Sequence, residues 1–274
     1  MAEDPEHADG AASRWDAGRT PWLQRQGLLR NVVRQELVSR QLAEHLPAPP
    51  ATVLDVGAGQ GTQALRLARL GFDVTAVEPD SRMRDAFEVA LGQERPDVAR
   101  RVHVEAGRLG ALPGVVTGRT FDVVCCHGVL MYLDAARPAI VELCALVAPG
   151  GALSLLARNA DAMALRPGLR RDWTAVQRLL DSAASEHPTY VNELGLPARA
   201  DRLEELASFV AGRRMHVEQW YGVRVLTDGV PVDEPVPDDP DEVAALLDAE
   251  ERVGRTDPYR RLATLLHLIG RRDG

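Results

Sequence analysis

Residues 53–62, VLDVGAGQGT, constrain the possible folds of this chain more than any other stretch. A run of strand-forming residues leads directly into Gly57, Gly59 and Gly61, three glycines at alternate positions. Glycine inside an ordered element costs about 0.5–1 kcal/mol relative to alanine, so the run predicts a turn whose backbone closely approaches another group. In open α/β sheets, turns at the carboxyl ends of the strands are where ligands bind.

Strand-like and helical segments alternate along the rest of the chain. Strand character is found at 52–56, 73–78, 101–105, 121–127, 152–158, 214–221 with an extended piece at 222–227, and 261–269. Helical patterns of apolar residues occupy 22–46, 61–71, 80–92, 134–147, 199–212 and 240–252. This alternation predicts an α/β fold, in which a parallel sheet carries helices on both faces. The uninterrupted apolar run at 121–127 is typical of a strand buried on both faces.

The chain is organised as a tail followed by one domain. Residues 1–18 are polar and rich in acidic residues, and we expect this tail to be disordered. Residues 19–274 have the length of a single domain, with a cap helix over 19–46 that ends at the PAPP of 47–50. Residues 159–198 carry several prolines and glycines among short helical patterns. We therefore predict an insertion there, close to the substrate site.

Composition and charge argue against several classes of protein. The formal net charge is −8, which disfavours a general nucleic-acid binder, but ten acidic residues and no basic residue fall within 228–251. The sequence suggests no role for that segment. No apolar run reaches the roughly 18 residues of a membrane helix, and the N-terminus lacks the apolar part of a signal peptide. Cys125, Cys126 and Cys144 lack metal-ligand spacing, so we expect a cytoplasmic protein with reduced core cysteines and no metal site.

The spacing of the glycines discriminates between ligands. Dinucleotide-binding turns follow the pattern Gly-x-Gly-x-x-Gly, whereas Gly57-x-Gly59-x-Gly61 puts Thr62 where the third glycine would stand. Asp55, near the end of the first strand, would repel a pyrophosphate but can support an amino-bearing ligand. The turn therefore predicts a nucleoside ligand without phosphates.

Glu78 is the second anchor of this ligand. It ends the second strand, 21 residues after Gly57. An acid about 20 residues beyond the first glycine, at a strand end, accepts hydrogen bonds from ribose hydroxyls. One ribose, an amino-acid moiety and no phosphate describe S-adenosylmethionine, which we predict to be the cofactor.

Four stretches resemble the motifs of class I S-adenosylmethionine-dependent methyltransferases. VLDVGAGQG is similar to the first motif of that class, VTAVEP to the second, FDVVCCHGVLMYL to the fourth-strand motif and LVAPGGALSLL to the turn into the fifth strand. The resemblance covers about residues 50–160. It implies a Rossmann-like, seven-stranded and mostly parallel sheet whose last strand is antiparallel.

Within this class, the chain is similar to the bacterial tRNA methyltransferases that esterify the carboxyl group of 5-carboxymethoxyuridine at the wobble position. QGLLRNVVRQEL resembles the Gly-Gln-Leu-Arg helix of that family, and RNADAM stands where the family has an aromatic-Asn-Ala segment. HGVLMYLDAARPAIVELCALVAPGGALSLL, GVRVLTD and EERVGRTDPYRRLATLLHLIGR are also similar. The resemblance implies a methyltransferase that acts on tRNA.

The resemblance also implies roles for residues around the cofactor. Arg30 would reach the cofactor's carboxylate, Ala58 would line the cofactor, and His127 would lie beside its methionine end. The complete set of expected cofactor-binding residues is Arg30, Asp55, Gly57, Ala58, Gly59, Gly61, Glu78, Pro79 and His127. The alternatives are that Arg30 is a solvated charge on its helix and that His127 is a core histidine.

A carboxylate acceptor has a pKa near ~4, so it is ionised at neutral pH and needs no general base. The protein must pair and desolvate it, which arginine does through bidentate hydrogen bonds. We prefer Arg224 as the catalytic arginine, because Trp220 and Tyr221 nearby can stack a flipped base. The expected substrate-binding residues are Arg158, Asn159, Arg199, Tyr221 and Arg224. The alternatives are an exposed strand charge for Arg224 and core positions for the two aromatic residues.

Two other functions remain open at this point. A small-molecule O- or N-methyltransferase would need a base for a hydroxyl acceptor, with His127 as the first candidate, and the insertion 159–198 would close over an apolar pocket. A tRNA enzyme would keep that surface open and rimmed by Arg166, Arg170 and Arg171. A cofactor-binding subunit without activity would show degenerate glycines or a lost ribose acid, and this sequence shows neither.

Overall fold

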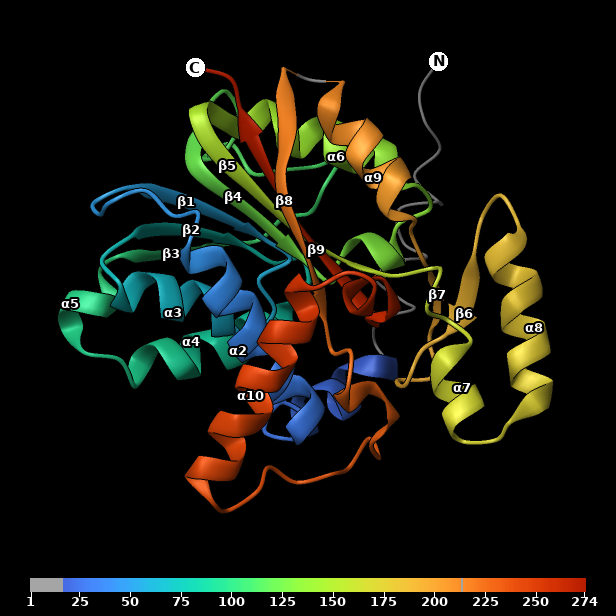
Figure 1. Ribbon diagram of the computed structural model, residues 1–274. Helices are drawn as coiled ribbons and strands as arrows, with labels where there is room; N and C mark the ends of the chain where they lie inside the picture. Colours follow the sequence, from blue (N-terminus) through green and yellow to red (C-terminus); the bar gives the residue numbers. More distant parts are fainter. Residues whose placement is uncertain (1–16, 213) are drawn as a thin grey trace.

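The computed structural model describes residues 17–212 and 214–274, which contain a seven-stranded sheet (Figure 1). The strands lie in the order β3-β2-β1-β4-β5-β9-β8. Their bounds are β1 Thr52–Val56, β2 Asp73–Val77, β3 Val102–Glu105, β4 Phe121–His127, β5 Val147–Arg158, β8 Met215–Val223 and β9 Leu265–Arg272. The strands β1 to β5 pair in parallel, and β9 runs antiparallel between β5 and β8. The predicted Rossmann-like sheet with an antiparallel last strand is confirmed.

Helices cover both faces of the sheet, as the alternating pattern predicts (Figure 1). On one face lie α6 (Ala136–Leu146) and α9 (Leu203–Ala211), and on the other lie α2 (Leu29–Ala43), α3 (Thr62–Arg69) and α10 (Pro240–Arg255). The other helices are α4 Ser81–Gly92, α5 Pro96–Ala99, α7 Leu165–Leu169 and α8 Trp173–Ala184, with 3-10 turns η1 Leu130–Tyr132, η2 Thr227–Gly229 and η3 Tyr259–Leu262.

The first strand shows why both helix layers are needed. Leu54 and Val56 pack into the apolar cluster beneath α6 and α9, whereas Val53 packs with Leu65 of α3 on the opposite face. Because side chains alternate along a strand, a strand buried on both faces is apolar at most positions, and Asp55 is the buried exception in β1. Most polar groups that could bind a ligand therefore lie in the loops at the strand ends.

The N-terminal cap is helical in two pieces. Residues 17–24 form a first helical piece and α2 a second, with a break at 25–28, so the prediction of one helix over 22–46 is wrong there. Leu28 has extended backbone immediately before α2, and the break is bridged by Asn31 Nδ2, which donates to Arg25 O at 2.8 Å. Most of the tail predicted to be disordered, residues 1–16, lies outside the described residues.

The segment between β5 and α9 forms a lobe beside the sheet (Figure 1). It contains α7, α8 and a two-stranded sheet of β6 (Thr189–Val191) and β7 (Pro197–Arg199). The helix predicted over 199–212 is shorter than expected and begins at Leu203, because 197–199 pair with β6. The extended piece predicted over 222–227 is also wrong beyond Val223, where β8 ends.

Within the part of the chain that the structure describes, no helix has the length and apolar character needed to cross a bilayer. The same residues contain no group of three or more His, Cys, Asp or Glu side chains arranged to hold a metal ion.

Candidate active site

A cavity of about 1210 Å³ opens at the carboxyl ends of the parallel strands. Its wall includes Gly57 after β1, Glu78 after β2, His127 at the end of β4 and Arg158 at the end of β5. The N-terminal cap, the lobe and the loop after β8 also contribute to the wall. This is the position at which open α/β sheets bind ligands.

Two glycines of the turn after β1 are required by close packing. A Cβ on Gly57 would collide with Val129 Cγ2, and a Cβ on Gly61 would collide with the ring of Phe87. Both residues have a positive φ, +73° and +86°, which also favours glycine. Gly59, at φ +58°, would bring its Cβ within 4 Å of one atom, Met83 Cε. Gly59 therefore leaves open space on the cavity side.

Glu78 connects this turn to the start of α4. Its Oε2 accepts a hydrogen bond from Gly59 N at 2.8 Å, and its Oε1 accepts one from Asp80 N at 2.9 Å. Burial raises the pKa of the Glu78 carboxyl, and these two hydrogen bonds oppose that shift. A carboxylate has about four acceptor sites, so both oxygens keep capacity for hydroxyl donors in the cavity.

The first helical piece closes one side of the cavity. Arg19 Nε donates to Asp80 Oδ2 at 2.8 Å, and Trp22 Nε1 donates to Gln60 Oε1 at 3.1 Å. The guanidinium of Arg34 lies 4.9 Å from the centroid of the Trp22 ring. The sequence analysis did not predict these contacts, although Arg19 and Trp22 are side chains that commonly line binding sites.

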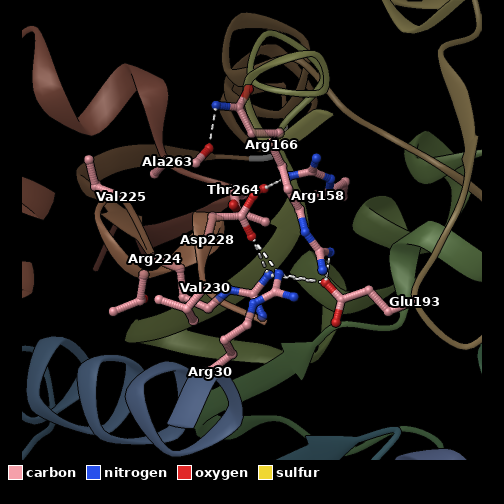
Figure 2. Close-up of polar contacts among 12 residues, drawn as sticks. Arg30, Arg158, Arg166, Glu193, Arg224, Val225, Asp228, Val230, Ala263 and Thr264 are labelled. Carbon is pink, nitrogen blue, oxygen red and sulfur yellow. Dashed lines mark hydrogen bonds and ion pairs between the residues drawn. The ribbon is translucent and has the colours of Figure 1, made fainter. Parts of the chain in front are cut away.

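Arginines and carboxylates from distant segments meet on another side of the cavity (Figure 2). Arg30 Nη2 of α2 lies 2.6 Å from Asp228 Oδ1 and 2.5 Å from Glu193 Oε1. Arg224, which follows β8, donates from Nη2 to the same oxygen of Asp228 at 2.9 Å. Arg166 of α7 pairs with the same oxygen of Glu193. This arginine cluster ties together the cap, the lobe and the loop after β8.

The cluster contains more guanidinium donors than its carboxylates occupy. The nitrogens Arg30 Nε, Arg30 Nη1, Arg166 Nε and Arg224 Nε are buried and have no hydrogen-bond partner among the described residues. Arg158 brings a fourth guanidinium, whose Nη1 donates to Thr264 O at 2.6 Å. With four cations and two carboxylates, the cluster keeps a positive charge that suits an anionic group.

The charges of the cluster act on one another. Burial, together with the charge of Arg224, lowers the pKa of Arg30 to about 10. Burial alone would raise the pKa of Asp228, but Arg224, Arg158 and Arg30 hold that pKa well below its usual range. Burial would likewise raise the pKa of Glu193, and the surrounding arginines lower it. Both carboxylates therefore stay ionised at neutral pH.

Arg224 has a left-handed backbone, with φ 61°, which is uncommon for a residue other than glycine. Such a conformation costs about 1–3 kcal/mol and persists where surrounding structure enforces it. Part of that support is Thr264 N, which donates to Arg224 O at 3.2 Å. The left-handed residue ends β8 and turns the guanidinium toward Asp228 at the cavity wall.

Glu250 of α10 holds the loop that follows Arg224. Its side chain is fully buried. Its Oε2 accepts a hydrogen bond from Val225 N at 2.8 Å. Its Oε1 accepts from Leu226 N at 3.0 Å, and from Thr227 N and Oγ1 at 2.7 and 2.6 Å. One carboxylate thus satisfies four donors and positions the loop.

Comparison with known proteins shows that this chain is similar to methyltransferases. Residues 54–155, which span most of β1 to β5, match the family described as Methyltransferase domain. The chain also superposes on a Burkholderia thailandensis N1-methyltransferase solved with 1,6-didemethyltoxoflavin and S-adenosylhomocysteine, at TM-score 0.57 and 16% identity, covering 100% of this chain and 92% of that one. This protein is an S-adenosylmethionine-dependent methyltransferase with the Rossmann-like fold of such enzymes.

Curated relatives extend over more of the methyltransferase than the domain match. It is 26% identical over 250 residues to tRNA 5-carboxymethoxyuridine methyltransferase of Escherichia coli K12. The alignment covers 90% of this chain and 89% of the relative. It is 28% identical over 201 residues to a mitochondrial ubiquinone biosynthesis O-methyltransferase of Schizosaccharomyces pombe. That alignment covers 71% of this chain and 66% of the relative. A glycopeptide N-methyltransferase solved with S-adenosylmethionine shares the fold, at TM-score 0.53 and 14% identity, over 88% of this chain and 94% of that one.

The residues of the methyltransferase cavity fit S-adenosylmethionine. Glu78 has acceptor capacity left for ribose hydroxyls, and Gly59 leaves space where a side chain would intrude. Gly57, Pro79 and His127, which were also expected at the cofactor, line the same cavity. We expect Glu78 to hold the ribose and the glycine turn to lie against the cofactor.

The other expected cofactor-binding residues do not line the cavity within the described structure: Arg30, Asp55, Ala58 and Gly61. Arg30 Nη2 forms ion pairs within the arginine cluster, and the contact of Arg30 with the cofactor carboxylate stays a prediction. Ala58 N donates to Val77 O at 3.2 Å, which makes Ala58 part of the turn's own hydrogen bonding. Gly61 serves the packing of α3 against α4.

Asp55 lies behind the glycine turn, fully enclosed by protein. Its Oδ2 is buried and makes no hydrogen bond with any described residue. Burial, and in second place the charge of Glu78, raise the pKa of Asp55 to about 7. The predicted direct contact between Asp55 and an amino-bearing ligand is therefore not supported by this arrangement.

Among the expected substrate-binding residues, Arg158 and Arg224 line the cavity, while Asn159 and Arg199 do not. Asn159 is buried, and its Nδ2 donates to backbone carbonyls of the segment before β9. Arg199 of β7 pairs with Asp201. Both residues stabilise the base of the lobe, a role that short sequence patterns do not reveal.

Tyr221 is a core residue, so its prediction as a platform for a base is wrong. Its side chain is buried, and its hydroxyl lies 2.8 Å from His45 Nε2. Trp220 instead stacks on the guanidinium of Arg260, at 3.9 Å from the ring centroid. Because adjacent side chains of a strand point to opposite faces, these two aromatic residues cannot stack on one base.

His127 lines the cavity, and its Nε2 lies 2.8 Å from Ser154 Oγ. Burial, together with the charge of Arg34, lowers the pKa of His127 to about 3. The ring is therefore neutral and a weak base at neutral pH. A base that removes a hydroxyl proton works best with a pKa near the working pH, so His127 is poorly suited to that role.

Glu78→Gln is expected to weaken cofactor binding by about 10–100-fold, because hydrogen bonds to a charged group contribute about 1.5–3 kcal/mol. The amide nitrogen of glutamine would also face the N–H of either Gly59 or Asp80, where the carboxylate now accepts. Titration calorimetry with S-adenosylhomocysteine measures the effect. Glu88→Gln on the exposed side of α4 is the matched control, and an equal affinity for both variants would contradict the assignment.

Proposed function

We propose that this methyltransferase esterifies a carboxylate carried by a modified uridine of tRNA. The observation that carries the proposal is the arginine cluster, whose buried guanidinium nitrogens lack partners among the described residues and whose four cations exceed its two carboxylates. The relative from Escherichia coli, which bears the name tRNA 5-carboxymethoxyuridine methyltransferase, supports the same acceptor.

The chemistry needs position and charge pairing rather than proton removal. When bound, S-adenosylmethionine supplies a methyl group on a sulfonium. The acceptor carboxylate, with a pKa near ~4, is already ionised, so the low pKa of His127 is no obstacle. Arg224 and Arg158 would hold the carboxylate by charge-assisted hydrogen bonds and fix its line of approach. Such orientation can supply about 7–11 kcal/mol of the barrier.

The mouth of the cavity has the charge that a nucleic acid requires. Arg170 and Arg178 line the cavity from the lobe and are exposed, and Arg171 beside them is exposed as well. Trp173, the first residue of α8, is 64% exposed and lies next to these cations in the sequence. Exposed arginines and an aromatic ring are the usual means of binding phosphates and unstacked bases. Arg166, expected on this rim, is instead paired with Glu193 inside the cluster.

The alternative is methylation of a small molecule at oxygen or nitrogen, which the Schizosaccharomyces pombe relative exemplifies. A hydroxyl acceptor would need a base. The low pKa of His127 makes it a weak base, and burial raises the pKa of the cavity residue Tyr132, so neither group is suited to accept a proton. Among oxygen acceptors, the cavity therefore favours one that arrives ionised.

The test uses S-adenosylmethionine with a labelled methyl group and bulk tRNA from a strain that lacks this gene. We expect label to enter the tRNA and to be released by mild base, as a carboxyl ester requires. We also expect kcat/KM not to rise tenfold per pH unit between about pH 6 and 9, because neither the acceptor nor His127 titrates there.

Two results would count against the proposal. Label that stays in the tRNA after mild base would indicate methylation of another atom. No label in tRNA, with cofactor binding intact, would direct the search to small metabolites, and a rate that rises tenfold per pH unit would then indicate a base-dependent acceptor.

A further inference from the structure

A chain of hydrogen bonds leads from the cap helix through the sheet to the floor of the cavity. Gln41 Oε1 of α2 lies 2.7 Å from His267 Nδ1 of β9. His267 Nε2 lies 2.8 Å from Ser154 Oγ of β5, and this hydroxyl lies 2.8 Å from His127 Nε2 at the end of β4. Gln41, Ser154 and His267 are fully buried. We call these four residues the relay.

The direction of the hydrogen bonds is set at the Gln41 end. Gln41 Nε2 donates to Gly222 O at 3.4 Å, so its Oε1 is the atom that faces His267. An amide oxygen only accepts, and therefore His267 Nδ1 must carry a proton. Burial, and next the charges of His127 and His45, hold the pKa of His267 far below its usual range, so its ring is neutral and its Nε2 is bare.

The directions of the other hydrogen bonds in the relay follow because each neutral imidazole carries one N–H proton and the Ser154 hydroxyl carries one proton. The bare Nε2 of His267 accepts the hydroxyl proton of Ser154. Because that hydroxyl has no second proton, its oxygen must accept from His127, whose Nε2 is thereby protonated. His127 is neutral, so its Nδ1 keeps a lone pair. No described residue forms a hydrogen bond with that Nδ1. The atom is not buried, and the ring lines the cavity.

We propose that Ser154, His267 and Gln41 are positioning residues that hold His127 in its neutral Nε2–H form, with the Nδ1 lone pair turned to the cavity. The proposal does not depend on the identity of the methyl acceptor.

A fixed neutral ring has two consequences for the methyltransferase. The cavity receives a cationic sulfonium and already contains Arg34, the charged group that acts on His127. An imidazolium at this position would repel both, whereas the neutral ring does not. The Nδ1 lone pair also gives the cavity one acceptor with a set direction, able to pair an N–H or O–H donor of a bound ligand.

The direct test is nitrogen-15 NMR on the full chain labelled at histidine, because two-bond correlations distinguish the two neutral forms of the ring and the imidazolium. With and without S-adenosylhomocysteine, between about pH 6 and 8, we expect His127 as the Nε2–H form and His267 as the Nδ1–H form. His127→Asn assigns the signal. An Nδ1–H or charged His127 in the wild-type protein would overturn the proposal without the need for any variant.

Ser154→Ala then separates positioning from mere packing. We expect the variant to show both neutral forms of His127 and to bind S-adenosylmethionine a few-fold more weakly, by the same factor at pH 6 and pH 8, because burial and Arg34 still keep the ring neutral. Cys126→Ala removes a similar volume from the neighbouring buried residue of β4 and should keep the wild-type spectrum. A Ser154→Ala protein that retained the pure Nε2–H form would show that the relay does not set the ring.

Discussion

Arg224→Ala is expected to lower kcat/KM for the carboxylate acceptor by about 10²–10³-fold, while the dissociation constant of the cofactor stays unchanged. The expected loss corresponds to about 3–4 kcal/mol, the usual cost of removing a preorganised charged donor from an enclosed site. Arg224 lines the cavity and has a buried Nε without a partner among the described residues. Steady-state methylation of tRNA and calorimetry with S-adenosylhomocysteine measure the two quantities.

Arg224→Lys refines this test, because lysine keeps the charge but not the planar fork that pairs with a carboxylate. We expect a loss intermediate between the wild-type protein and the alanine variant. Arg214→Ala is the matched control, since Arg214 shares the left-handed backbone, with φ 56°, but is exposed and does not line the cavity. If Arg224→Ala kept more than half of kcat/KM, the acceptor would have to bind elsewhere in the cavity.

Glu250→Ala is expected to lower the free energy of unfolding by about 3–5 kcal/mol, the largest stability effect that the structure indicates. The change would leave three backbone N–H groups and the Thr227 hydroxyl without the acceptor they now share. A buried donor left unpaired costs about 1–3 kcal/mol, although solvent entering the loop recovers part of that sum. For a chain of this size, the loss corresponds to a Tm decrease of about 10 °C.

Chemical denaturation of Glu250→Ala and Glu251→Ala side by side checks this prediction. Glu251 is the next residue of α10 and forms partly exposed ion pairs with Arg40 and Arg255, which contribute about 0–1 kcal/mol. Equal stability of the two variants would refute the role given to Glu250. Because Glu250 positions the loop after Arg224, we also expect the alanine variant to lose methylation under conditions in which it remains folded.

The sequence alone was sufficient for the sheet and for the wall of the cavity that the glycine turn and Glu78 form. Strand 52–56 leads directly into the glycine turn, and Glu78 follows at a fixed spacing. The positions of these residues therefore depend mainly on local backbone geometry. The register of a parallel sheet then brings the carboxyl ends of β1, β2 and β4 together, so local pattern was enough to place Gly57, Gly59 and Glu78 in one cavity wall.

The acceptor side was only partly predictable. Arg158 and Arg224 line the cavity, and their contacts with the acceptor stay predictions, whereas Tyr221 is buried in the core beside His45. The acidic segment 228–251, which had no role in the sequence, contributes Asp228 to the arginine cluster. Glu250 lies at helical spacing from the buried Leu247 and Gly254, and this spacing in the sequence indicates that Glu250 is on the buried face of its helix.

What the tertiary structure decided is the partner of each buried charge. Arg30 and Asp228 are 198 residues apart, and Gln41 and His267 are 226 apart, so no local pattern can report that they meet. An arginine at a strand end binds substrate, pairs internally or faces solvent according to which carboxylates the fold brings beside it. Chain topology sets those long-range pairings, and the charge state and direction of each donor in the cavity follow from them.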